Sequence, residues 1–209
     1  MPAALVLFGD VIRSRREPIA ATEWLRILTT DLNETYPAGE RLAPFEFTQG
    51  DEIQGLLAPI SDPLRSVLRA TLHPAAARMR WVVVAGEVDP GHGPATQRSG
   101  PAFIAARDRL TVAVARRELL AMISGDPATD DLLDGLAPLL GELLADMTHR
   151  QREIAWLVLV EGLRRSDAAE RLGVSRATVS VAADRAHLGS IGELARVVRR
   201  LLARATMGA

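Results

Sequence analysis

The stretch "RRSDAAERLGVSRATVSVAADRA", residues 164–186, predicts two short helices joined by a tight turn. Ser166 and Ser175 can each cap a helix start, and Gly173 can end the first helix in a left-handed conformation. The small residue Ala169 stands where the two helices would cross. These offsets favour a helix-turn-helix, with a helical hairpin of no special function as the alternative.

The flanking segments extend this helical region. Thr148 and Gln151 have the spacing of a capping box, which predicts a helix start, and Gly162 can end that helix. The segment 191–205, "IGELARVVRRLLARA", has apolar residues at helical spacing and is expected to be a closing or a dimerisation helix.

The charge is divided unevenly along the chain. Residues 1–147 hold 14 arginines and 20 acidic residues, a net charge of −6, whereas residues 148–209 hold 11 arginines and 6 acidic residues, a net charge of +5. A basic segment after an acidic body favours contact with a polyanion, although a chance division would give the same sums.

The pattern "AAERLGVSRATVS" (168–180) resembles the helix-turn-helix of sigma-factor region 4 and of LuxR-type regulators, and "MTHRQREIAWLVLVEG" (147–162) resembles the helix that precedes it there. The second helix, about Arg176 to Ala186, would then enter the major groove of double-stranded DNA. Some helix-turn-helices bind protein instead. The residues expected to contact DNA are Arg164, Arg165, Ser166, Ser175, Arg176, Ala177, Thr178, Ser180, Val181 and Arg185.

The acidic part, residues 1–147, has the sequence pattern of alternating strands and helices. Apolar runs and turn residues predict strands at 4–12, within 45–57 as a hairpin, and at 79–88, with helices at 17–36 and from Ser61 to near Pro74. This order of strand, helix, two strands, helix and strand predicts an α+β, ferredoxin-like antiparallel sheet with helices on one face. A fifth strand is expected at 119–124. We therefore expect a ferredoxin-type domain (1–125), a helical linker (126–147) and an all-α helix-turn-helix domain (148–209).

Two carboxylates stand at the ends of predicted neighbouring strands. Asp10 closes the first strand, and Asp51 lies in the hairpin tip of "FEFTQGDEIQGLL", residues 45–57. In the ferredoxin-like order they can approach each other and hold a divalent metal ion against a triphosphate. Ordinary Gly-Asp turn chemistry is the alternative, and Glu52 is expected on the opposite face of its strand.

The order "FGDVI", "TQGDEIQGLL", "RWVVVAG" and "GPAFIAARDRL" resembles the catalytic domain of class III nucleotidyl cyclases. Over almost the whole chain, "GDVIRSR", "QGDEIQ", "GPAFIAAR" and the helix-turn-helix resemble the SatD family. The resemblance implies metal binding by Asp10 and Asp51, with Mg²⁺ or Mn²⁺ and a nucleotide. It implies nucleotide contacts by Phe47, Gly50, Arg80 and Arg107, and a cyclase-like homodimer.

The chain departs from the cyclases at polar positions of the reaction. Phe47 occupies the position of the lysine that reads the purine in cyclases, and Ile104 occupies that of the asparagine that stabilises the transition state. Asp108 occupies the position of the arginine that follows, although Arg107 lies next to it. Each such loss lowers a rate by ~10²–10³-fold, so we expect ligand binding without catalysis. The sequence thus predicts a transcriptional regulator with a degenerate cyclase-like domain. The alternatives are an active nucleotidyl cyclase and a protein-binding adaptor.

Composition limits the location and the chemistry of the protein. There is no cysteine, no apolar run long enough to span a membrane and no signal-like N-terminus, which favours the cytoplasm. All 25 basic residues are arginine, which excludes a mechanism that needs lysine.

Overall fold

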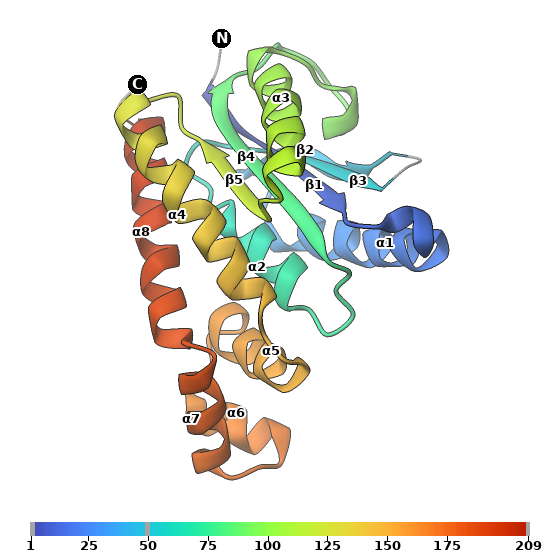
Figure 1. The fold of residues 1–209 in the computed structure, drawn as a ribbon. Coiled ribbons are helices and arrows are strands. Elements are labelled where there is room, and N and C mark those ends of the chain that lie inside the picture. The colour runs from blue at the N-terminus through green and yellow to red at the C-terminus, as the bar shows by residue number, and fades with distance from the viewer. Residues whose placement is uncertain (1–2, 49–50, 208–209) are drawn as a thin grey trace.

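The computed structural model describes residues 3–48 and 51–207 as an α+β fold with a helical C-terminal region (Figure 1). The strands are β1 (Ala3–Val11), β2 (Arg41–Phe47), β3 (Glu52–Leu57), β4 (Met79–Glu87) and β5 (Leu120–Ile123). The α-helices are α1 (Pro18–Thr35), α2 (Leu64–Leu72), α3 (Pro101–Arg116), α4 (Pro127–Ala145), α5 (His149–Ala155), α6 (Arg165–Leu172), α7 (Arg176–Arg185) and α8 (Leu188–Met207). Each strand and helix predicted from the sequence is present within a few residues.

The five strands form one sheet in the order β2-β3-β1-β4-β5. The pairs β2–β3, β3–β1 and β1–β4 are antiparallel, whereas β4 and β5 run parallel. The sheet is therefore mixed, and the expectation of an antiparallel sheet was wrong at β5. The reason is the crossover through α3, since a strand that returns through a helix can run in the same direction as the strand before it.

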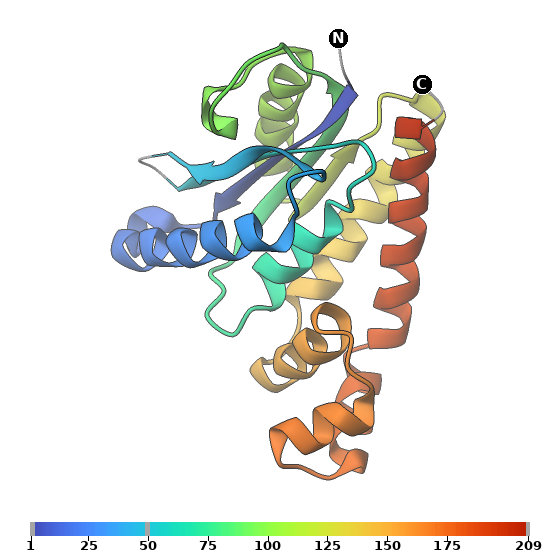
Figure 2. The same cartoon turned by 180° about the vertical axis from the view of Figure 1, so that it is seen from behind.

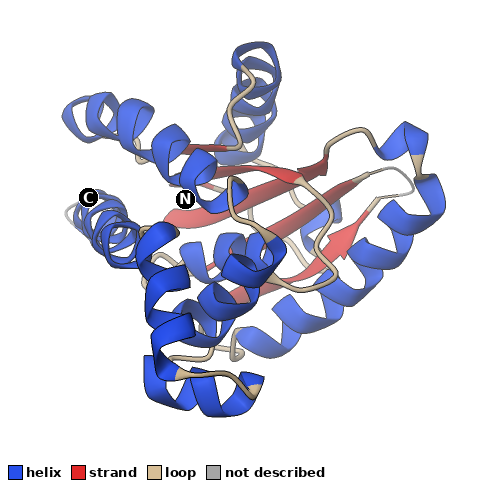
Figure 3. Ribbon diagram, turned by 60° about the horizontal axis from the view of Figure 1, so that its bottom comes forward, coloured by secondary structure: helices blue, strands red, loops and turns tan. Residues whose placement is uncertain are grey.

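Helices cover both faces of the sheet (Figures 2 and 3), so the prediction of helices on one face was wrong. Leu5 and Leu7 of β1 belong to the core that includes residues of α1 and α2, whereas Val6 and Phe8 belong to the core that includes residues of α3. Central strands that are apolar on both sides require cover on both sides, and β1 is such a strand.

The helix α4 packs on the sheet and also against α8, which runs back along it from the far end of the molecule (Figure 1). Leu140 and Leu144 of α4, together with Val198 and Leu202 of α8, belong to the same core as the α1 face of the sheet. The segment expected as a linker is thus a packed helix, and the division into three domains stays a prediction.

The helix α8 is also tied to the sheet region by charge. Its Arg199 side chain donates from Nε to the Asp62 carboxylate just before α2, at 2.6 Å. In the part of the chain that the structure describes, no helix is both long and apolar enough to cross a membrane.

Candidate functional site

The helices α6 and α7 and the turn between them have the geometry that the sequence predicted. Gly173 ends α6 with φ +63°, a left-handed conformation that glycine adopts without steric cost. The Ser175 hydroxyl caps α7 by accepting a hydrogen bond from the Thr178 amide at 3.1 Å. Ala168, Ala169 and Val179 are buried where the two helices meet. The helix-turn-helix prediction is confirmed in its local geometry.

The preceding helix α5 begins at the predicted capping box. Thr148 donates its amide to Gln151 Oε1 at 2.8 Å and accepts from the Gln151 amide at 3.4 Å. The helix continues through the π-helical turn η3 (Trp156–Val160) to Gly162, which has φ +71°. It packs against α7, so the two helices form one support for the turn.

The predicted cap at Ser166 was wrong. Arg164 is the residue that precedes α6, and it makes no side-chain cap. The Ser166 hydroxyl donates instead to Asp167 at 2.9 Å, because the helix already includes Ser166 in its first turn. Hydrogen bonds from the Arg164 guanidinium and from Ser166 lower the pKa of Asp167 and keep its carboxylate charged near the helix N-terminus.

The helices α6 and α7, which carry most of the predicted DNA-contact residues, lie at the far end of the molecule from the sheet (Figure 1). Arg164 and Arg165 are engaged by the acidic partners Asp167 and Asp184, at 3.0 and 2.8 Å. The residues exposed to solvent are Arg164, Ser175, Arg176, Ala177, Thr178, Val181 and Arg185, and the half-buried ones are Arg165, Ser166 and Ser180.

Two arginines on α7 differ from Arg164 and Arg165 at the start of α6. Arg176 and Arg185 are exposed and make no side-chain hydrogen bond or ion pair within residues 3–48 and 51–207. The same holds for Arg171 near the end of α6, which the sequence reasoning did not select. Val181, 51% exposed between the arginines, is an apolar side chain suited to a thymine methyl group. The α7 surface therefore combines free guanidinium groups with an exposed apolar residue.

A second candidate site is a cluster of charges on the α3 face of the sheet. Asp10 of β1 lies directly opposite Glu52 of β3 and Arg80 of β4 in the strand register. Arg80 donates to the Asp10 carboxylate at 3.1 Å and to the Glu118 carbonyl at 2.9 Å. Burial, and then the charge of Asp51, raises the pKa of Asp10 to about 6.

Glu52 belongs to this cluster, so its expected place on the opposite face was wrong. Its carboxylate is buried and accepts hydrogen bonds from both Nη atoms of Arg107 of α3, and Gln54 donates to it at 2.7 Å. Residues directly opposite each other in antiparallel strands point to the same face, and the register pairs Glu52 with Asp10. The pairing of β1 with β3 therefore decided on which face of the sheet Glu52 lies, and this pairing forms only when the chain folds.

Asp51 lies beside the end of β1, where its carbonyl accepts a hydrogen bond from the Val11 amide at 2.9 Å, whereas Phe47 lies apart from the cluster. The Asp51 carboxylate accepts a hydrogen bond from Ser14, and Phe47 packs with the core on the α1 side of the sheet. Gly50 lies outside the described residues. Among the residues that the structure describes, no group of three or more His, Asp or Glu side chains could hold a metal ion. The structure therefore brings Asp10, Arg80 and Arg107 to one face without Phe47.

A pocket of about 580 Å³ lies beside the cluster, between the sheet and the N-terminal part of α3. Arg107 lines it, and its guanidinium lies 4.7 Å from the centre of the Phe8 ring. Arg98 also lines the pocket, with its Nε atom buried and without a hydrogen-bond partner in the described structure. The pocket thus offers aromatic and guanidinium surface to a ligand.

The raised pKa of Asp10 predicts a pH-dependent effect of Asp10→Asn. A carboxyl group whose pKa rises on folding contributes stability that is complete below pH 3.8 and is lost as the pH rises through 6. Solvent screens this effect because Asp10 is partly exposed, so we expect the ionised carboxylate to lower the free energy of unfolding by ~1 kcal/mol. At pH 8 the variant should therefore melt ~2–4 °C higher than wild type.

Thermal melts of wild type and variant at several pH values test this prediction. The advantage of Asp10→Asn should shrink progressively between pH 6 and pH 4. The exposed Asp131→Asn is a control with the same change of charge and should show no such trend. A variant that is less stable than wild type at pH 8 would mean that the ion pair with Arg80 outweighs burial.

The helices α6 and α7 thus have the local geometry of a helix-turn-helix, and α5 precedes them. Residues 140–196, from the end of α4 into α8, match the model of a family described as TrfB plasmid transcriptional repressor. No curated protein matches the chain.

Proposed function

We propose that the protein is a DNA-binding transcriptional regulator whose helix α7 enters the major groove. The observation that carries the proposal is the α7 surface, where Arg176 and Arg185 are exposed and unpaired. Free guanidinium groups can contact guanine edges or phosphates, whereas Arg164 and Arg165 would first have to leave their acidic partners. The match of residues 140–196 to a repressor family supports the same function.

Selection of DNA from a random pool by the purified full-length protein tests this function. We expect an enriched sequence and an affinity that falls steeply with salt, since each neutralised phosphate contributes about −0.9 to the slope of log K against log salt. A protein-binding adaptor would select no sequence. Such a result would contradict the proposal and favour the adaptor.

We propose that the sheet region is a degenerate nucleotidyl cyclase-like domain of the SatD type. The order β2-β3-β1-β4 with antiparallel pairing supports a ferredoxin-like core to which β5 adds a parallel edge. Ile104, at the position of the cyclase asparagine, is 66% exposed and offers no hydrogen bond from its side chain. An active cyclase is the alternative, and turnover of nucleoside triphosphates with Mg²⁺ or Mn²⁺ would establish it.

We further propose that this domain binds a nucleotide and pairs as a homodimer. The pocket beside Arg107 supports a nucleotide, because it offers stacking surface and guanidinium groups. Asp10 contacts Arg80 and Asp51 contacts Ser14, so a divalent ion held by these two carboxylates would have to replace both contacts. Light scattering of the purified protein tests the dimer.

The nucleotide proposal predicts a loss of ligand-dependent stabilisation in Asp10→Asn and Asp51→Asn. Wild-type protein should melt higher with at least one nucleotide, tested with and without Mg²⁺ or Mn²⁺, and each variant should lose that increase. A ligand at 100 times its Kd would stabilise the wild type by ~2.7 kcal/mol, or ~5–10 °C. The exposed Asp131→Asn should keep the full increase. If no nucleotide shifts the wild type, the carboxylates are structural.

A further inference from the structure

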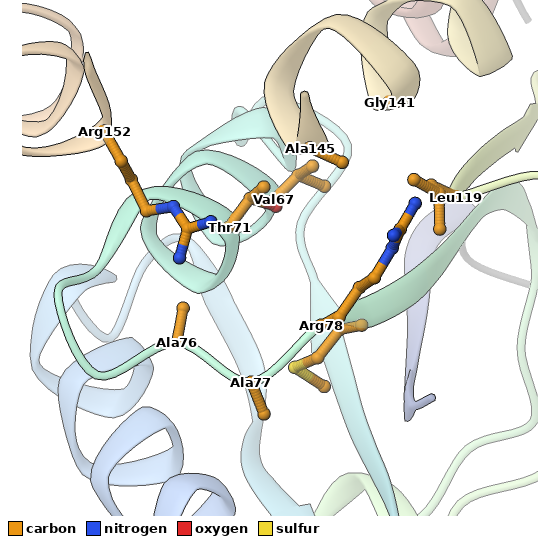
Figure 4. A pocket seen from close by; sticks show the side chains of 10 residues that line it. Val67, Thr71, Ala76, Ala77, Arg78, Leu119, Gly141, Ala145 and Arg152 are labelled. Atoms are coloured by element: carbon orange, nitrogen blue, oxygen red, sulfur yellow. The ribbon is translucent and has the colours of Figure 1, made fainter. Parts of the chain in front are cut away.

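A smaller pocket of about 190 Å³ lies where the sheet region meets the helices that carry the helix-turn-helix (Figure 4). Its walls come from α2, from the segment before β4, from α4 and from α5. Arg152 enters from α5 and Arg78 from the segment before β4, and the remaining lining includes Thr71, Ala77 and Ala145.

Both arginines of this pocket lack a partner. Within residues 3–48 and 51–207, the side chains of Arg78 and Arg152 make no hydrogen bond or ion pair. The Arg78 side chain is exposed, so water can hydrate it, whereas the Nε atom of Arg152 is buried and water does not satisfy it. By contrast, Arg69 of α2 and Arg150 of α5 are paired with carboxylates at 2.6 and 2.9 Å. A buried, unpaired guanidinium donor is unfavourable unless an anion supplies the missing hydrogen bonds.

We propose that this pocket binds a small oxyanion, of the class of inorganic phosphate or a short carboxylate. The guanidinium group presents N–H donors in a planar fork that matches the oxygens of both anions. The Thr71 hydroxyl lines the same cavity and can donate a further hydrogen bond. The volume is below the ~300–1,000 Å³ of pockets for drug-sized ligands, so a whole nucleotide is too large.

The position of the pocket would allow a bound anion to affect the helices of the proposed DNA-binding surface. Arg152 lies on α5, and α5 packs against α7 and α2. An anion that joins Arg152 to Arg78 would fix α5 relative to the sheet and so bias the orientation of α7. This regulatory step rests on the proposed DNA-binding function, whereas binding of the anion does not.

Calorimetric titration of the full-length protein with inorganic phosphate and with malonate, at constant ionic strength, tests the site. We expect saturable binding of at least one anion in wild type, and a loss of affinity of roughly ten-fold or more in Arg152→Gln and in Arg78→Gln. Arg26→Gln removes an exposed arginine of α1 and should bind as wild type does. The absence of saturable binding, or equal affinity in all variants, would overturn the site.

DNA binding with and without the anion then tests the regulation. At equal ionic strength, the anion should change the Kd for the selected DNA in wild type and leave it unchanged in Arg152→Gln. An unchanged Kd in wild type would overturn the regulatory step. A protein that binds no DNA would refute the proposed function, while the titration would still decide the anion site.

Discussion

Replacing Arg176 with alanine should weaken binding to the selected DNA by about 5- to 150-fold, the effect of losing one bidentate contact to guanine. Arg176 is the first residue of α7, where recognition helices approach base edges, and its side chain is exposed and unpaired in the described structure. The affinity can be measured by fluorescence anisotropy over a range of salt concentrations. Because the side chain supports no other residue, the melting temperature should stay within about 2 °C of wild type.

The salt dependence separates base reading from phosphate contact. Loss of a phosphate contact lowers affinity for all sequences and reduces the slope of log K against log salt by about 0.9, whereas loss of a base contact relaxes sequence preference at one position. The same measurement on Arg185→Ala would show whether Arg185, at the end of α7, contacts a phosphate or a base. Arg26→Ala on α1 is the matched control, and equal affinity for Arg176→Ala and this control would exclude Arg176 from recognition.

Leu140→Ala in α4 should lower the free energy of unfolding by about 2–5 kcal/mol, which corresponds to a melting temperature about 4–20 °C lower. The Leu140 side chain is 0% exposed and belongs to the core that the sheet shares with the C-terminal helices. Its removal would leave a cavity at the centre of this packing. Urea unfolding followed by circular dichroism measures the loss.

Leu139→Ala provides the control because the same substitution is made one residue earlier on the same helix. Leu139 is 47% exposed, so its replacement should change stability by less than about 1 kcal/mol. We also expect one cooperative transition in Leu140→Ala, since α4 packs against both β5 and α8. Equal effects of the two variants, or separate unfolding of the sheet, would contradict the shared core.

Local patterns predicted the helices and strands well because each depends on residues close in sequence. The pattern of α7 and its turn followed from Gly173 and Ser175, and the start of α5 followed from Thr148 and Gln151. The errors concerned features that depend on how distant segments pack together. The strand β5 was predicted, but its parallel pairing with β4 and the cover that α3 gives to the second face were not.

The candidate sites divide in the same way. Exposed residues of α7 could be selected from helical spacing alone, because a helix that buries one face must present the other. The partners of those residues could not be selected, as Arg165 shows through its pair with Asp184. On the sheet, Asp10 was found from its place at a strand end, while Glu52 was assigned to the wrong face.

The sequence by itself determined much of the local structure of this protein, including the caps of α5 and α7, the left-handed Gly162 and Gly173 and the surface that α7 presents. The tertiary structure decided which charges meet. Arg80 reaches Asp10 across 70 residues, Arg107 reaches Glu52 across 55, and Arg78 shares a pocket with Arg152. Caps and turns depend on backbone angles that a few neighbouring residues set, whereas these contacts depend on strand register and helix packing, which exist only after the whole chain has folded.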